Sequence, residues 1–210
     1  IEHDYIKAMD PGFAGTDYEM PINVNLNQTC NAFWDGYSVN FFQAGGGCAN
    51  TGQIADVIYH EYGHGVSQFV MAPLGPSGSE GEGFSDYIAA TITDQPLIGR
   101  GFFGPGSSLR TCDNNRQWPA PECGGEVHCE GEVIAGALWH MRQNMVTHFG
   151  QGRGVSHADS LFQYARYGRN QTFEGYYLDI LAVDDNNGTL VDGTPNAKQI
   201  IMAFHDRHNI

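Results

Sequence analysis

The sequence contains few basic residues. Only ten of its 210 residues are Lys or Arg, whereas 24 are Asp or Glu, and the formal net charge is −14. Such a charge opposes binding to the phosphates of nucleic acids and to anionic lipid headgroups. The sequence also lacks an apolar run that approaches the roughly 20 residues of a membrane-spanning helix. We therefore expect no nucleic acid and no membrane among the partners of this protein.

Paired cysteine motifs are missing as well. None of the cysteines forms a C-x-x-C pair, so we do not expect a structural zinc site built from cysteines. Cys30 and Cys48 flank a strand–turn–strand stretch and are predicted to form a disulfide. Cys112 is expected to pair with Cys123 or Cys129, which leaves one cysteine over. Two disulfides indicate an oxidising compartment, and we expect a secreted, extracellular protein.

The length of the chain allows one domain or two closely packed lobes. A short helix is expected over residues 2–9. Alternating apolar and polar residues predict strands at 20–27 and 37–42, with NAFWDG at 31–36 as the turn before the second. The remaining pattern is mostly helical, so the sequence favours an α+β class with a small antiparallel sheet.

Most of the helical pattern lies in the last two thirds of the chain. Residues 94–125 interrupt it and read as a long irregular segment rich in Gly, Pro and Cys. Ser156, Thr172 and Thr194 are typical N-cap residues, and Pro195 suits a first helical position. The expected helices span residues 57–70, 81–92, 130–149, 156–167 and 172–182, and a last one follows residue 194.

The first of these helices contains the pattern H-E-x-x-H, as His60, Glu61 and His64. Residues four apart lie on one face of a helix, so the two imidazoles can bind one metal ion. Neutral imidazoles suit Zn²⁺, and a catalytic zinc takes three protein ligands and leaves one position open. Glu61 points from an adjacent angle and is placed to take a proton from an attacking water. The bare motif is as consistent with two solvated or packed histidines as with a metal site.

The segment that follows supplies a candidate third ligand. A turn rich in Gly, Pro and Ser, residues 72–81, ends the first helix, and a second helix then begins. Glu82 lies in the first turn of that helix, and Asp86 lies four residues later on the same face. We expect Glu82 to complete the zinc site and Asp86 to accept the second ring N–H of a ligand histidine. The alternative is an acidic helix start that the helix dipole favours.

Four motifs give the sequence a family resemblance. NAFWDG, HEYGHGVS, GEGFSD and EVHCEGEVIAGALW occur in order within residues 2–149. They resemble the thermolysin-like and fungalysin-like metallopeptidases. The resemblance implies a thermolysin-like two-lobed fold with a cleft between a small antiparallel sheet lobe and a mainly helical C-terminal lobe. We assign residues 1–70 to the first sub-domain and 71–210 to the second, together one catalytic unit. The β-rich N-terminal region is shorter than in the family.

The resemblance also implies substrate-binding positions. Asn31 and the backbone of Ala32 match the edge strand that holds an extended peptide in this family. Arg110 matches the arginine that binds the substrate carbonyl beside the scissile bond. Leu109 and Val57 match residues that line the primed-side pocket. The alternatives are a turn cap for Asn31 and a solvated side chain for Arg110.

A histidine further along the chain matches the family's oxyanion donor. His128 lies in the last motif and is expected to stabilise the tetrahedral oxyanion, with Glu122 or Glu126 as the acid that orients it. The alternative is an exposed polar residue. The family's assisting tyrosine is absent from residues 65–81, so that role is empty or filled from elsewhere.

The C-terminal third matches the family poorly. Asp184, Asn186 and Asp192 place oxygen-bearing side chains around Gly188. This spacing resembles a calcium-binding loop, and Ca²⁺ would be a second cofactor besides Zn²⁺. An Asx-rich turn that leads into a helix explains the same residues equally well.

The predicted function is that of a secreted zinc-dependent endopeptidase. It would act as a monomer on a peptide or protein substrate and hydrolyse internal peptide bonds, with Glu61 as general base. A zinc aminopeptidase shares the ligand spacing but needs acidic groups that bind a substrate amino terminus. A peptide-binding pseudoenzyme would require a broken ligand or base, and His60, Glu61, His64 and Glu82 are all in place.

Overall fold

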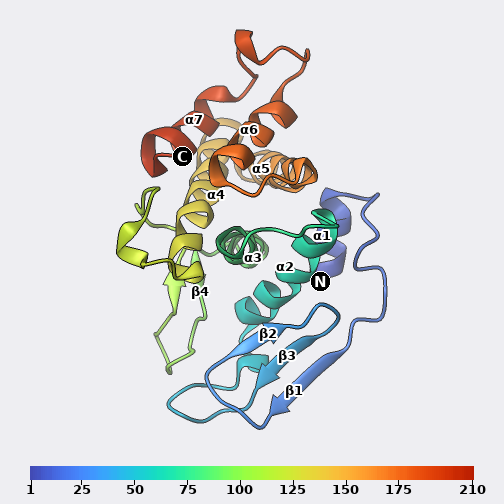
Figure 1. Ribbon diagram of the computed structural model, residues 1–210, viewed down its shortest axis with the longest axis vertical. Helices are drawn as coiled ribbons and strands as arrows, with labels where there is room; N and C mark the ends of the chain where they lie inside the picture. The colour runs from blue at the N-terminus through green and yellow to red at the C-terminus, as the bar shows by residue number, and fades with distance from the viewer.

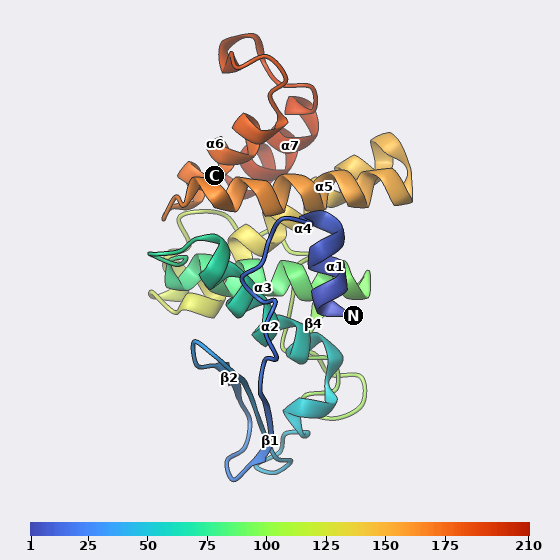
Figure 2. The ribbon, with the colours of Figure 1, turned by 90° about the vertical axis from the view of Figure 1, so that its right-hand side faces the viewer.

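The computed structural model describes residues 1–210 and has a mixed α+β fold that is 54% helical. The expected fold class is thus confirmed at this level. The sheet lies at one end of the molecule, α2 and α3 lie in the middle, and α4 runs from the middle to the other end, where α5 to α7 lie (Figures 1 and 2). None of the helices is long and apolar enough to cross a membrane. The helices are α1 Glu2–Met9, α2 Ala55–Val70, α3 Gly78–Thr93, α4 Val127–Phe149, α5 Gln151–Ala165, α6 Phe173–Asp184 and α7 Ala197–His208.

The larger sheet has three strands in the order β1-β3-β2 and differs from the expected antiparallel sheet. Its strands are β1 Ile22–Leu26, β2 Ala32–Trp34 and β3 Val39–Phe42. The NAFWDG motif supplies β2 as well as the turn. β2 and β3 are antiparallel, but β1 and β3 are parallel. Because the chain reverses direction after β1 and again after β2, the first and third strands run the same way.

The segment at 94–125 contains more structure than its composition indicates. β4 Leu97–Ile98 and β5 Arg110–Thr111 form a second, two-stranded antiparallel sheet. A 3₁₀ turn covers Pro121–Cys123 just before α4. These short pairings hold both ends of a glycine-rich loop and place Arg110 beside α3.

Several helix starts differ from the sequence prediction: α2 and α4 begin two and three residues earlier than expected, at Ala55 and Val127. Ser77 and Glu80 form a reciprocal capping box, so α3 begins earlier and Glu82 lies in its second turn. Helix α5 begins at Gln151 after Gly150, where φ is +83°, and Ser156 therefore lies inside the helix. Thr172 caps α6 as expected. By contrast, α7 begins at Ala197 with Asn196 as its N-cap residue. Thr194, the expected N-cap, donates its hydroxyl to Asp184 instead.

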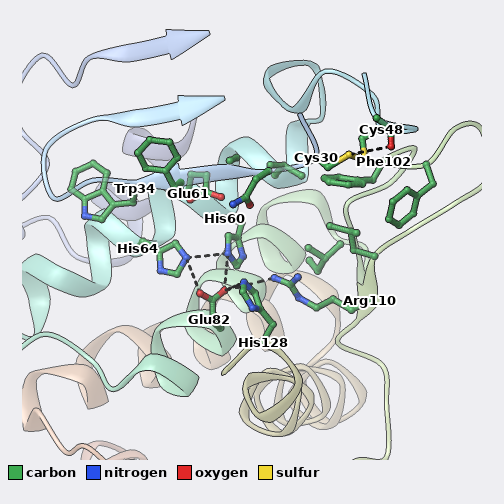
Figure 3. Close-up of a pocket in the computed structure, with 18 residues that line it drawn as sticks. Cys30, Trp34, Cys48, His60, Glu61, His64, Glu82, Phe102, Arg110 and His128 are labelled. Atoms are coloured by element: carbon green, nitrogen blue, oxygen red, sulfur yellow. Dashed lines mark hydrogen bonds and ion pairs between the residues drawn. A yellow bond between two sulfur atoms is a disulfide. The ribbon is translucent and has the colours of Figure 1, made fainter. Parts of the chain in front are cut away.

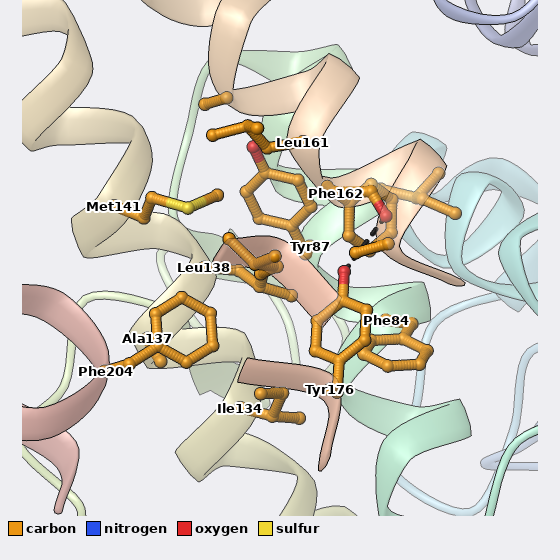
Figure 4. Packing of buried hydrophobic residues seen from close by; sticks show 14 of the residues in the cluster. Phe84, Tyr87, Ile134, Ala137, Leu138, Met141, Leu161, Phe162, Tyr176 and Phe204 are labelled. Atoms are coloured by element: carbon orange, nitrogen blue, oxygen red, sulfur yellow. Dashed lines mark hydrogen bonds between the residues drawn. The ribbon is translucent and has the colours of Figure 1, made fainter. Parts of the chain in front are cut away.

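The main core forms where α3 packs against α4 and α5. Phe84 and Tyr87 of α3 meet Leu138 of α4 and Phe162 of α5 in a cluster of 27 buried residues (Figure 4). Burial of such large apolar side chains is the dominant stabilising contribution to a core. Ile6 of α1 belongs to the same cluster, so the N-terminal helix packs on the helical part and not on the sheet.

A smaller core lies between the sheet and α2. Phe41 of β3, Val57 of α2 and Phe102 of the glycine-rich loop belong to this group of seven buried residues. The sheet is thereby fixed against the helix that carries His60 and His64.

One of the expected disulfides is confirmed and the other is different. Cys30 pairs with Cys48, as predicted. Cys123 pairs with Cys129, and Cys112 is the free cysteine, so the expected pairing of Cys112 was wrong. Cys112 directly follows β5 and is buried beside α3 and α4, whereas the other two cysteines lie on either side of a tight turn at the start of α4.

Candidate functional site

A cavity of about 690 Å³ lies between the sheet, α2 and α3. Its walls come from β2, the loop that contains Phe102 and Phe103, and the start of α4, which contributes His128 (Figure 3). The strand β2 pairs only with β3, so its other edge is free. The cavity is therefore an open cleft with a strand edge along one side.

His60, His64 and Glu82 come together in this cleft. The two Nε2 atoms are 3.0 Å apart, and the carboxylate oxygens of Glu82 lie 3.2 Å from His60 and 3.7 Å from His64. One ligand atom of each residue lies within 4.8 Å of the others, and no other group of His, Cys, Asp and Glu in the chain has this geometry. The predicted ligand set is thus assembled by the fold, and it could hold a metal ion.

The approach of α2 to α3 depends on small residues. A Cβ atom on Gly63 would lie 3.0 Å from the backbone of Ser85, closer than van der Waals contact allows. Glycine at this position lets the two helix backbones approach. Glu82 can then reach the two histidines even though it lies one turn further into α3 than expected.

The charges at this site depend strongly on one another. Burial disfavours a charge on His60, but the nearby carboxylates of Asp86 and Glu82 outweigh it and raise its pKa to about 10. Burial and the proximity of His60 lower the pKa of His64 to about 4. Burial opposes the ionisation of Glu82, yet His60 and its other histidine neighbours lower its pKa to about 2. The cleft thus combines an ionised carboxylate and a neutral imidazole, both of which are kinds of group that bind metals, with the ring of His60, which must release its Nε2 proton before it can bind a metal ion.

The donor atoms fit a small divalent cation. Oε2 of Glu82 is buried and makes no well-aligned hydrogen bond, although the ring nitrogens of His60 and His128 lie 3.2 and 3.3 Å from it; a buried carboxylate oxygen is usually hydrogen-bonded. Nε2 of His64 faces Nε2 of His60 at 3.0 Å, and at most one of the two can donate to the other. A cation between the three residues would satisfy all these lone pairs at once. Two nitrogens and one carboxylate oxygen are a ligand set typical of catalytic zinc.

Asp86 contacts His60 on the side of the imidazole ring opposite Glu82 and His64. Its Oδ1 accepts a hydrogen bond from Nδ1 of His60 at 2.7 Å, as the sequence predicted. The same carboxylate accepts two hydrogen bonds from Arg110, at 2.6 and 2.8 Å. Burial opposes its ionisation, but Arg110 and His60 hold the pKa of Asp86 well below its usual range. Arg110 lines the cleft as expected, and its guanidinium is also an anchor for Asp86.

Glu61 lies in the cleft next to His60. It is buried, and burial raises the pKa of its carboxyl group. A carboxylate with a raised pKa accepts a proton more readily than an exposed one and can later return it. Its position agrees with the predicted role as a base.

His128 points into the cleft from the start of α4. Its Nε2 lies 3.3 Å from Oε2 of Glu82, and its Nδ1 lies 2.7 Å from Oε1 of Glu126. Glu122 instead pairs with Arg116 at 2.6 Å. Of the two acids considered as partners of His128, the structure therefore selects Glu126.

The expected substrate-binding residues all line the same cleft. Asn31 and Ala32 lie at the start of β2, Val57 is on α2, and Leu109 precedes β5. Sequence reasoning did not anticipate Phe102 and Phe103 or the Cys30–Cys48 disulfide as parts of the wall. A pair of aromatic residues in a loop otherwise rich in glycine was the available signal for Phe102 and Phe103.

Two of the three candidate calcium residues, Asp184 and Asp192, are engaged in other contacts. Asp184 is buried, and its carboxylate accepts hydrogen bonds from Thr194 and from the backbone and side chain of Asn196. Asp192 accepts one from Asn187. Asp184 thus joins the end of α6 to the residue before α7. These contacts favour an Asx-rich turn that leads into a helix over a calcium loop with Asn186.

No family model matches this sequence, and no curated protein matches it significantly.

Proposed function

We propose that this protein is a zinc-dependent endopeptidase of the thermolysin-like and fungalysin-like type. The observation that carries the proposal is the convergence of His60, His64 and Glu82 in an open cleft beside the free edge of β2. The cleft thus combines a ligand set for zinc with a backbone edge that can pair with an extended peptide.

Zn²⁺ bound by His60, His64 and Glu82 would supply Lewis acidity, which polarises a carbonyl group and acidifies water. Glu61 accepts the proton of the attacking water and passes it to the leaving amine. His128 donates a hydrogen bond to the developing oxyanion. Arg110 fixes Asp86 and through it the ring of His60, and it also faces the substrate.

The substrate would lie along β2. Asn31 and the backbone of Ala32 would bind the peptide main chain, while Val57 and Leu109 would contact a side chain. A strand edge pairs with any extended backbone, so such a site accepts internal segments of a chain. The two disulfides suit an extracellular protein, and we include secretion in the proposal.

The contents of the cleft favour an endopeptidase over an aminopeptidase. An aminopeptidase needs a carboxylate that binds the free amino group of its substrate. Glu61 and Glu82 are the only acidic residues that line the cleft, and both already have roles as base and ligand. We therefore prefer cleavage of internal bonds.

Metal analysis and peptide cleavage test this proposal together. We expect one zinc per chain in the wild type and cleavage of a peptide blocked at both ends. His64→Ala should lose the zinc and the activity. His205→Ala, which changes an exposed histidine of α7, is the matched control and should retain both. Wild-type protein without zinc, or cleavage only of peptides with a free amino terminus, would contradict the proposal.

A further inference from the structure

The turn before His128 is almost entirely exposed. Residues 124–128 are all exposed, and Gly124 and Gly125 adopt φ values of +62° and +84°. Two consecutive glycines leave a backbone free to sample many conformations. Packing against the core therefore contributes little to the position of residues 124–126, which connect Cys123 to α4, and His128, the second residue of α4, faces the cleft.

A disulfide closes this turn. Cys123 and Cys129 lie six positions apart, one before the two glycines and one directly after His128. The cross-link therefore encloses Glu126 and His128 in one short loop. A cross-link over such a span removes most alternative conformations of the enclosed segment.

Glu126 connects the enclosed backbone to the ring of His128. Its carboxylate accepts backbone hydrogen bonds from His128 at 3.1 Å and from Cys129 at 2.8 Å. The same carboxylate accepts the 2.7 Å hydrogen bond from Nδ1 of His128. Glu126 thus sets the direction of the His128 imidazole. Glu126 itself lies in the short segment between the two disulfide-bonded cysteines, Cys123 and Cys129.

We propose that Cys123 and Cys129 are positioning residues, whose disulfide holds Glu126 and His128 in the geometry that directs Nε2 of His128 into the cleft. This inference rests on the proposed function for its catalytic consequence. Its structural content, the fixed ring of His128, is independent of that function. The Cys30–Cys48 disulfide, which lies in the opposite wall of the cleft (Figure 3), does not enclose His128.

The first test is the variant Cys123→Ser/Cys129→Ser. We expect it to keep its zinc and to keep KM within about threefold, because the ligands and β2 are unchanged. The value of kcat should fall by on the order of 10-fold to 10²-fold, the loss that a misplacement near 1 Å causes. An unchanged kcat in the folded variant would overturn the proposal. Cys123→Ala/Cys129→Ala serves the same purpose if the serine variant does not fold.

A double-variant comparison separates positioning from general stabilisation. If the disulfide acts through His128, removing the disulfide from the His128→Ala variant should lower kcat by less than about twofold. The effects of two substitutions that act through the same residue are not additive. If the disulfide merely stabilises the protein, the loss should be the same in both backgrounds. Equal losses would therefore refute the positioning role.

A spectroscopic readout keeps this inference separate from the proposed function. In ¹⁵N-histidine-labelled wild-type protein, the proton on Nδ1 of His128 should give a protected signal, because Glu126 accepts it. The signal should disappear in Cys123→Ser/Cys129→Ser and persist in the control Cys30→Ser/Cys48→Ser. If the wild type proves inactive on peptides, the proposed function fails and this signal alone decides the inference. A signal that persists without the Cys123–Cys129 bond would overturn it.

Discussion

The carboxylate of Asp86 lies 2.7 Å from Nδ1 of His60 and fixes the direction of that imidazole. Nδ1 donates to Asp86, and Nε2 is thereby the atom that faces His64 and Glu82 in the cleft. Arg110 holds Asp86 with two further hydrogen bonds. The candidate ligand is therefore oriented by a chain of contacts that runs from β5 through α3 to α2.

We expect Asp86→Asn to weaken zinc binding by roughly 10–100-fold, the usual effect of removing such a partner. The amide can rotate to accept from His60, but it then presents its N–H₂ group to Arg110. Competition for zinc with a chromophoric chelator measures the zinc affinity of each variant. Asp206→Asn, on exposed α7 surface, is the control. Equal affinities in both variants would show that Asp86 does not support the metal.

We expect Glu61→Gln to retain zinc and fold while its turnover falls by roughly 10²–10⁴-fold. The amide has nearly the same shape but cannot take a proton from water. Single-turnover cleavage of a blocked peptide, together with the zinc content, measures both properties. Near-normal turnover would place the base elsewhere.

We expect His128→Ala to lower kcat by about 10²–10³-fold, the cost of one oxyanion donor. The interaction forms mainly in the transition state, so KM should change only a few-fold. Steady-state kinetics on zinc-loaded protein separate the two parameters. A kcat within about threefold of the wild type would make His128 a surface histidine without a catalytic role.

We expect Gly83→Ala to destabilise the protein by about 1–3 kcal/mol, as overpacking of a core does. A Cβ atom at Gly83 would lie 2.5 Å from the carbonyl oxygen of Gly131 and would also collide with Ile134, where α3 and α4 cross. Chemical denaturation measures the free energy of unfolding. The control is Gly152→Ala on α5, where a Cβ atom meets nothing within 4 Å, and it should stabilise by up to about 1 kcal/mol.

We expect the turn between β2 and β3 to loosen in acid. Hydrogen bonds from the hydroxyl and backbone of Ser38 and from the backbone of Tyr37 lower the pKa of Asp35 from 3.8 to about 2. The folded-state pKa is depressed, so the contribution to stability is complete above pH 3.8 and is lost as the pH falls towards 2. Amide exchange in β2 and β3 should therefore differ between wild type and Asp35→Asn at neutral pH and converge in acid. A difference that does not depend on pH would refute this explanation.

Local patterns in the sequence determined a large part of the site. The spacing of His60 and His64 places both on one face of a helix whatever surrounds it, because the α-helical period depends only on the backbone. Asp86 follows Glu82 by the same rule. The Cys30–Cys48 disulfide was predictable because a short strand–turn–strand unit brings its ends together. The α+β class followed from the periodicity of apolar residues.

Only the tertiary structure decided the relationships between distant segments. The parallel pairing of β1 with β3, the Cys123–Cys129 bond and the choice of Glu126 over Glu122 as partner of His128 depend on where the chain turns. The contact of Arg110 with Asp86 joins residues 24 positions apart. Such contacts are set by the packing of whole helices against one another, and packing is determined by the complete set of side chains and not by any local pattern.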